Sequence, residues 1–244
     1  MDPETDLMTP PPRRGRIFVA SRRVRLGDAD PRGELRLDAL ARYLQDVATD
    51  DSLDCAMERS MAWVVRKTTV VIQSSPKLGE ELELATFCSG TGSHFARRRT
   101  SIAGADGAAI EVVALWVHVD LDSGRPRRLG ADFHEIYGEA AEGRHIRARL
   151  THSDPPTGTT GRPFELRSTD LDVLDHVNNA VFWVGVEEEL ARRAVKGPRG
   201  RAEVEYRAPV LGTDAVRLES TLDSNLLRLW FVVDDQVKAS AVVG

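Results

Sequence analysis

Polar groups that could act on a carbonyl compound are concentrated in one ten-residue stretch of the chain, Asp170-Leu171-Asp172-Val173-Leu174-Asp175-His176-Val177-Asn178-Asn179. Carboxylates and a histidine here directly precede an apolar run. Asn178 or Asn179 can cap a helix that starts at this point, because a short side-chain oxygen accepts a backbone N–H of the first turn. The stretch is therefore a candidate site for polarising a carbonyl or holding an anion.

The element that must position these groups is the helix that follows them. Residues 180–186 are all small or apolar, and the segment then becomes charged at Glu187-Glu188-Glu189. This pattern indicates a helix that is buried on most sides and emerges into water. Unpaired amides and the positive end of its dipole point toward the polar stretch. Taken alone, the same residues could be only caps and turn formers, as Asp and Asn before a helix commonly are.

Composition restricts the class of protein. The chain has 244 residues, 41% of them hydrophobic, and a net charge of −5, which argues against a general nucleic-acid binder. It has no apolar run long enough to cross a membrane, and its N-terminus lacks the apolar core of a signal peptide. Cys55 and Cys88 show neither metal-site spacing nor a disulfide framework. We expect a soluble cytoplasmic protein without a metal or cofactor.

Along the chain, the pattern predicts two similar units. Residues 1–15 read as a disordered tail, because a proline triplet cannot join a sheet or a helix. Residues 16–125 read as a strand, a helix to about residue 49 and further strands, and residues 126–161 as a linker with a short helix near 133–137. Residues 162–244 then repeat the order, with a short strand at 164–167 before the second helix and strands after it.

An internal repeat supports this division. The segment from Arg25 to Asp30 falls on the segment from Arg167 to Asp172 at an offset of 142 residues. A second anchor places residues 75–79 on residues 208–212 at an offset of 133. Two anchors in the same order make a duplication the best explanation. Each unit is expected to wrap an antiparallel sheet around its own helix, and the two units should pack as an intrachain pseudo-dimer.

These residues carry a family resemblance. Asp28-Ala29-Asp30-Pro31-Arg32-Gly33 is similar to the active-site loop of 4-hydroxybenzoyl-CoA thioesterase, and residues 170–179 resemble the Asp-x-Asp-x-x-x-His-Val-Asn-Asn signature of acyl-ACP thioesterases. The resemblance covers about residues 17–243. It implies an α+β fold, a tandem double hotdog in which two antiparallel sheets each wrap a central helix. It also implies hydrolysis of fatty acyl-ACP, or of acyl-CoA, to free fatty acid and carrier thiol.

The resemblance also suggests roles for individual residues. Asp172 would be the general base or nucleophile, His176 would orient water or the thioester, and Asn178 and Asn179 would complete the site or cap the helix. Backbone N–H groups at the helix start would polarise the carbonyl. The chain departs from the plant enzymes at Leu174, where they have a catalytic Asn, and at residues 209–210, where they have Glu-Cys.

The first unit is expected to have kept the fold and mostly lost the chemistry, because Glu34 stands where His176 does. Its helix and the following strand could instead wall the tunnel for the acyl chain, or simply fill the core, through Leu40, Tyr43, Leu44 and Trp63. Gln45 and Asp46 could contribute polar groups across the pseudo-dimer interface. Arginine clusters at 97–99, 125–128 and 192–201 could meet an acidic carrier protein or the phosphates of CoA, or could be solvated surface.

Two other readings stay open on the sequence alone. A hotdog hydratase or dehydratase also uses Asp and His, but that family's loop carries a proline between the two residues, and none lies between Asp172 and His176. A non-catalytic acyl-binding protein would keep the tunnel without turnover. The expected partner is acyl carrier protein or a CoA thioester, and the chain is expected to be a monomeric pseudo-dimer or a homodimer.

Overall fold

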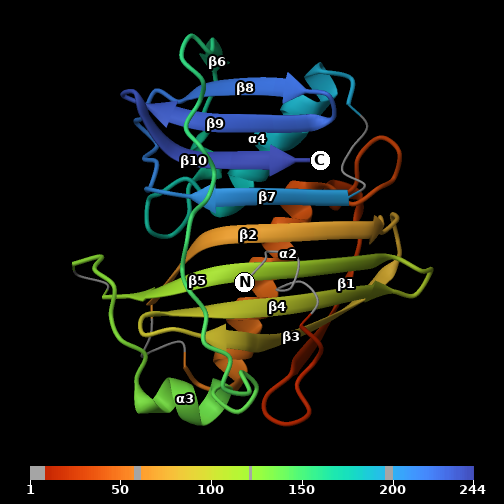
Figure 1. Ribbon diagram of the computed structural model, residues 1–244. Coiled ribbons are helices and arrows are strands. Elements are labelled where there is room, and N and C mark those ends of the chain that lie inside the picture. Colours follow the sequence, from red (N-terminus) through yellow and green to blue (C-terminus); the bar gives the residue numbers. More distant parts are fainter. Residues whose placement is uncertain (1–8, 58–61, 121–122, 196–199) are drawn as a thin grey trace.

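The computed structural model describes residues 9–57, 62–120, 123–195 and 200–244, which form one continuous antiparallel sheet with two long helices on one face (Figure 1). The strands in this part of the chain are β1 (Phe18–Arg23), β2 (Ala62–Ser74), β3 (Glu81–Thr91), β4 (Phe95–Gly104), β5 (Ala109–Val119), β6 (Gly161–Pro163), β7 (Gly200–Tyr206), β8 (Arg217–Asp223), β9 (Leu226–Val233) and β10 (Gln236–Val243). The helices are α2 (Leu37–Asp54), α3 (Ala131–Tyr137) and α4 (Asn179–Arg192), and 3-10 turns occur at Leu26–Asp28 and Ser168–Asp170. No helix among the described residues is long and apolar enough to span a bilayer.

The order of strands divides the sheet into two equivalent halves. It runs β1-β3-β4-β5-β2-β7-β10-β9-β8-β6, so the first five strands come from the first unit and the last five from the second. The halves join where β2 pairs with β7, from Lys67 opposite Glu205 to Ile72 opposite Gly200. The two expected sheets are therefore halves of one sheet, joined edge to edge, and the expected α+β class is confirmed.

The two long helices pack on the same face of the sheet and against each other. Their apolar faces and the facing strands form one core that extends through both halves, and Trp183 of α4 is 1% exposed within it. Gly185 lets α4 approach the sheet closely, since a Cβ at this position would lie 2.6 Å from the Phe231 ring. Burial of this shared apolar surface fixes where each helix begins relative to the sheet.

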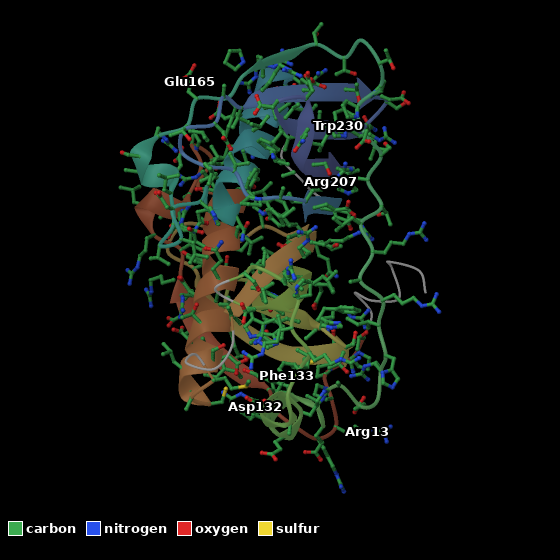
Figure 2. All side chains as sticks on the ribbon, turned by 90° about the vertical axis from the view of Figure 1, so that its left-hand side faces the viewer. Arg13, Asp132, Phe133, Glu165, Arg207 and Trp230 are labelled. Carbon is green, nitrogen blue, oxygen red and sulfur yellow. The ribbon has the colours of Figure 1, made fainter. Side chains whose placement is uncertain are left out.

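The opposite face of the sheet carries the segment that joins the two halves. In Figures 1 and 2 the chain after α3 runs along this face to β6, on the side away from α2 and α4. Its backbone is attached at the joint between the halves, where the N–H groups of Thr151 and His152 donate to Glu205 at 2.7 and 3.0 Å. Lys67 lies 3.2 Å from the same carboxylate, which is fully buried. The connection is therefore a packed strap.

The repeat is visible in the hydrogen bonds of the turn before each helix. Asp30 N–H donates to Glu34 O at 2.8 Å, and Asp172 N–H donates to His176 O at 2.8 Å. The first anchor, with its offset of 142 residues, therefore matches equivalent positions in the two units.

The second anchor was misplaced by one residue. The β-bridges pair Glu34 with Lys77 and His176 with Leu211, so the equivalent positions are 134 residues apart. The sequence alignment had matched Pro76 to a proline at 209 and gave 133. A proline at neighbouring positions of the two turns serves each turn without marking the same position.

Three further expectations need correction. Helix α2 continues to Asp54 instead of ending near residue 49, because the carboxylate of Asp51 is buried and bonded to Arg98, so an acidic residue here does not mark a solvated connection. The short strand before the second helix lies at residues 161–163, where it pairs with β8, and not at 164–167. Residues 9–15 of the expected tail are packed, with Thr9 and Pro12 buried, while residues 1–8 lie outside the described residues.

Candidate active site

The turn that carries Asp172 is held by its own carboxylate. Asp172 Oδ1 accepts hydrogen bonds from Leu174 N–H at 2.8 Å and from His176 N–H at 3.3 Å. The turn closes with Asp175 in the left-handed region at φ 61°, a conformation that Asp tolerates better than most residues. One oxygen of Asp172 is thus used for structure, and the other is left to act on a ligand.

Asn178 is the N-cap of α4, as the sequence predicted. Its Oδ1 accepts from Ala180 N–H at 2.9 Å and also from Gln45 Nε2 at 3.0 Å. Gln45 belongs to α2 of the other half, so the polar group expected across the pseudo-dimer interface is found there. This bond joins the two helices beside Asp172.

A cavity of about 420 Å³ opens at this point between α2 and the sheet of the first half. Asp172, Asn178 and Asn179 lie at its walls, so three of the four expected catalytic residues meet at one cavity. The volume lies in the range typical of small-molecule sites. The complete lining is Gln45, Ala48, Thr49, Ser52, Trp63, Cys88, Ala96, Arg97, Arg98, Trp116, Phe133, Tyr137, Asp172, Val173, Asn178 and Asn179.

The first turn of α4 provides a backbone donor at the cavity. Ala180 N–H is taken by the Asn178 side chain, and Val181 N–H donates to Asn178 O at 2.9 Å. Asn179 N–H has no acceptor among the described residues. It lies at the positive end of the helix dipole, where a developing negative charge is stabilised.

The equivalent amide of the first half is blocked. Leu37 stands in α2 where Asn179 stands in α4, and its N–H donates to Glu187 Oε1 at 2.8 Å. Glu187 is in turn the repeat equivalent of Gln45, which bonds to the cap side chain instead. Arg36, in the cap position, makes no side-chain cap and pairs with Asp38 at 2.8 Å. The two helix starts therefore differ in one feature that matters chemically, a free amide against an occupied one.

His176 is placed differently from the other expected catalytic residues. It is half-buried, forms a β-bridge with Leu211 and is not among the residues that line the cavity. Its backbone, through the bond to Asp172 Oδ1, supports the turn. Its ring makes no hydrogen bond to a described residue, so the imidazole is available for a ligand that enters beside the turn.

The expected substrate-binding residues divide into two groups. Trp63 lines the cavity, and Leu44 lines a smaller one of about 30 Å³ next to it. Leu40 is a core residue at 2% exposure. Tyr43 is also buried, and its hydroxyl donates to Asp28 Oδ2 at 2.7 Å, while burial and that carboxylate raise its pKa. The last two therefore support the fold and lie outside the cavity.

Sequence reasoning missed Arg98. The run at 97–99 had been considered as a basic surface cluster, but it lies in β4, where side chains alternate between the two faces. Arg97 bonds to Ser89 and Arg99 to Glu111, whereas Arg98 lines the cavity and donates to Asp51 at 2.7 Å. The period-two alternation within a strand was the signal that could have separated the three.

The other basic clusters also changed meaning. Arg192 and Arg193 both pair with the buried carboxylate of Glu189, at 2.6 and 2.7 Å, so they stabilise the end of α4. Lys196 and Arg199 lie outside the described residues. The segment at 125–128 is exposed and remains the part of these clusters that is open to a partner.

A group of His152, Glu203 and Glu205 has ligand atoms within 4.8 Å of one another. Lys67 Nζ lies 2.6 Å from Glu203, and Arg201 lies 2.8 Å from the same carboxylate. These cations supply the positive charge that a metal would supply. The hydrogen bond to His152 and the Lys67 charge hold the pKa of Glu203 well below its usual range against the opposing effect of burial. We interpret the group as an ion-pair cluster.

Comparison with known families gives a match over most of the chain. The model described as the acyl-ACP thioesterase N-terminal domain matches residues 15–137, and the C-terminal domain model of the same family matches residues 154–238. Two uncharacterized proteins from strains of Mycobacterium tuberculosis are 29% identical over 233 residues, which cover 95% of this chain and 93% of theirs.

Solved structures share the fold. A protein described as an oleoyl thioesterase from Lactobacillus plantarum has a TM-score of 0.82 at 19% identity, over 95% of this chain and 96% of its own. The 12:0-ACP thioesterase from Umbellularia californica has a TM-score of 0.78 at 17% identity, over 94% and 97%. An acyl-ACP thioesterase from Bacteroides thetaiotaomicron has a TM-score of 0.75 at 16% identity, over 100% and 99%. The expected double hotdog is confirmed.

Proposed function

The chain belongs to the acyl-ACP thioesterase family, and we propose that it hydrolyses a fatty acyl thioester of acyl carrier protein at a single site, formed by Asp172 and the start of α4. Acyl-CoA is the alternative carrier that the same chemistry would accept. The family establishes a thioester hydrolase. The residues that carry the reaction, the choice of carrier, a cytoplasmic location and a monomeric state are parts of the proposal.

The observation that carries the single site is the difference between the two helix starts. At α4 the Asn179 amide is without a protein acceptor and borders a cavity that also contains Asp172. At α2 the equivalent Leu37 amide is bonded to Glu187. A thioester carbonyl can therefore receive a hydrogen bond from the backbone in the second half, while a protein carboxylate already occupies this place in the first.

The geometry supports a hydrolysis in which the protein supplies a base and an oxyanion donor. Water attacks the carbonyl carbon while Asp172 accepts its proton, and the oxygen that becomes negative receives the hydrogen bond from Asn179 N–H. Collapse of the tetrahedral intermediate breaks the carbon–sulfur bond, and the proton held by Asp172 returns to the departing thiolate. Direct attack by Asp172 would give an anhydride that water then cleaves.

His176 and Leu174 occupy the positions around this reaction that the family pattern makes important. The exposed side chain of Leu174 cannot donate a hydrogen bond, and the His176 ring has no protein partner. We propose that His176 holds the attacking water or the thioester from the side of the turn. The water would then be positioned by one histidine and one carboxylate without help from residue 174.

Release of free thiol tests the proposal directly. The purified chain is incubated with acyl-ACP and acyl-CoA of matched chain length, and thiol is measured with a chromogenic disulfide. We expect turnover with acyl-ACP and a kcat/KM that falls with the CoA substrate. Absence of thiol release from both carriers across chain lengths from six to sixteen carbons would contradict the proposed activity and favour an acyl-binding protein without turnover.

A further inference from the structure

The cavity beside Asp172 has a polar wall along α2. Gln45, Ala48, Thr49 and Ser52 recur at the spacing that places residues on one face of a helix, and three of these four are polar. Trp63 and other aromatic residues provide the opposing apolar surface. Sites for purely apolar ligands are lined mainly by hydrophobic side chains. The α2 wall therefore indicates a ligand that is not a plain hydrocarbon along its whole length.

A guanidinium group forms part of the same wall. Arg98 lies in the middle of the sheet, opposite Cys88 of β3 and Ala114 of β5, with a side chain that is 16% exposed. It lines the cavity and donates from Nη1 to Asp51 at 2.7 Å and to Thr86 at 3.2 Å. Arginine has five N–H donors on three nitrogens. Donors on the other two nitrogens remain for a ligand in the cavity.

The charges around Arg98 are already balanced. Asp51, which is 1% exposed, accepts from Arg98, from Arg16 Nε at 2.6 Å and from Tyr137 hydroxyl at 2.9 Å. Arg16 also pairs with Asp54 at 2.6 Å, so two cations meet two carboxylates. An additional negative charge on the ligand would be repelled by Asp51 as well as attracted by Arg98. A neutral oxygen, which accepts a hydrogen bond without a net charge, fits this environment better.

The distance from the reacting end to Arg98 follows from the helix. Gln45 bonds to the cap of α4 at the reacting end, and Ser52 lies next to Asp51 at the other end. Seven residues of helix span about 10 Å at 1.5 Å per residue. An extended chain advances about 1.2 Å per bond, as the reach of an extended backbone implies. The cavity wall therefore accommodates about eight bonds between the carbonyl and the guanidinium.

We propose that the cavity selects medium-chain acyl thioesters that carry a neutral oxygen, a hydroxyl or a keto group, near the end distant from the thioester, and that Arg98 is the residue that recognises this oxygen. The inference rests on the proposed hydrolysis of acyl thioesters and specifies its substrate class. An alkyl chain of the same length would cover the Arg98 donors without replacing their hydrogen bonds to water, which disfavours its binding.

The first test uses the wild-type protein and needs no variant. Hydrolysis rates are measured for octanoyl-CoA, 8-hydroxyoctanoyl-CoA and the CoA thioester of the eight-carbon dicarboxylic acid. We expect kcat/KM for the hydroxylated substrate to exceed that of the octanoyl substrate by about tenfold or more, the size expected of one hydrogen bond to a charged donor. Equal values, or a preference for octanoyl, would overturn the proposal. A preference for the terminal carboxylate would overturn its claim of a neutral group.

The second test assigns the selectivity to Arg98. Arg98→Met removes the guanidinium and leaves Asp51 with its Arg16 and Tyr137 donors. The matched control is Arg99→Met in the adjacent position of β4, whose guanidinium pairs with Glu111 at 2.7 Å and does not line the cavity. We expect Arg98→Met to reduce the ratio between hydroxylated and plain substrates at least tenfold, and Arg99→Met to keep the wild-type ratio. A similar ratio in both variants would exclude Arg98 as the recognising residue.

Failure of the activity and failure of the selectivity can be told apart. If no CoA thioester is hydrolysed, binding is measured by calorimetry with analogues in which CH₂ replaces the thioester sulfur. Tighter binding of the hydroxylated analogue, lost in Arg98→Met, would support the inference even though the proposed hydrolysis had failed. Equal binding of the hydroxylated and plain analogues would contradict the inference independently of catalysis.

Discussion

Asp172 and Asp30 occupy the same position of the same turn, and both accept hydrogen bonds from two backbone amides of that turn. Asp30 is also paired with Arg32 at 2.9 Å, and these bonds lower its pKa despite its partial burial. A carboxylate with an ion pair in the turn is a weaker base and is less available to a ligand. At the scale of single residues, the half that reacts is therefore distinguished by what its aspartate does not bind.

His176→Ala tests the proposed role of the imidazole. We expect turnover to fall by about 10²–10⁴-fold, the range typical of a group that assists proton transfer, because the ring has no protein partner and is free to act on a ligand. Stability should change little, because the ring is half-buried and supports no hydrogen bond to a described residue. A melting temperature lowered by several degrees with normal activity per folded molecule would instead identify a structural residue.

Glu187 gives a prediction about pH. Burial, together with the Asp38 charge, raises the pKa of Glu187 to about 7, although the Leu37 amide opposes the shift. A carboxyl with a raised pKa in the folded state stabilises the fold fully below its unfolded pKa, near 4.5, and loses this contribution as pH rises through 7. Glu187→Gln should remove the loss, because glutamine can accept from Leu37 N–H and remains neutral.

The measurement is the free energy of unfolding between pH 5 and pH 9. We expect the variant to exceed the wild type by on the order of 2 kcal/mol at pH 9, and the difference to vanish near pH 5. Glu188→Gln, at an exposed neighbouring position, is the control and should follow the wild type. Parallel curves for Glu187→Gln and the wild type would show that Glu187 ionises normally in the fold.

At the scale of elements, the turn before each helix is the unit that places the chemistry. Asp175 closes the second turn at φ 61° and Gly33 closes the first at φ 76°, both in the left-handed region. A β-branched residue is strained there. Asp175→Val and Gly33→Val should each lower stability by about 1–2 kcal/mol, while only Asp175→Val should also lower kcat, because it displaces Asp172.

Thermal melting and thiol release on the two variants check this prediction. About 1 kcal/mol corresponds to a shift of roughly 2–4 °C for a chain of this size. Equal losses of kcat would mean that both turns carry catalytic groups. Unchanged melting temperatures would mean that the turns relax without strain.

Much of this local structure could be predicted, and the misses have physical causes. Periodicity placed α4 and its Asn178 cap correctly, because both depend on neighbours in the sequence. It ended α2 too early at its acidic residues, since the partners of Asp51 lie far away in Arg16 and Arg98. Whether a residue such as Tyr43 lines a cavity or fills the core depends on which strands face the helix, and local sequence does not carry that information.

At the scale of the whole molecule, the two halves are joined by an ion-pair cluster beneath the strap. Lys67 of β2 contacts Glu203 and Glu205 of β7 at 2.6 and 3.2 Å, and all three side chains are largely buried. Figure 2 places Arg207 and Trp230 on the strap side of the sheet, where the Trp230 indole donates to Ser153 O at 2.8 Å. The strap, the joint and both halves are thus connected, and we expect them to unfold together.

Lys67→Met tests this connection. Removal of one partner leaves buried carboxylates short of positive charge, so we expect a loss of about 3 kcal/mol and a single cooperative unfolding transition. The control is Lys77→Met, which removes an exposed pair with Glu34 at 2.6 Å and should cost less than about 1 kcal/mol. Chemical denaturation followed by tryptophan fluorescence and by circular dichroism compares them. Two separate transitions would contradict the single cooperative unit.

The division of labour between the two halves is the central claim, and paired substitutions of the two aspartates test it most directly. Asp172→Asn keeps size and much of the hydrogen bonding but removes the base, whereas Asp30→Asn makes the same change in the half whose helix amide is occupied by Glu187. Thiol release from acyl-ACP is measured for both variants together with their melting temperatures. We predict that Asp172→Asn abolishes turnover while remaining folded, and that Asp30→Asn retains most of it. Equal losses of turnover in the two folded variants would contradict a single active site.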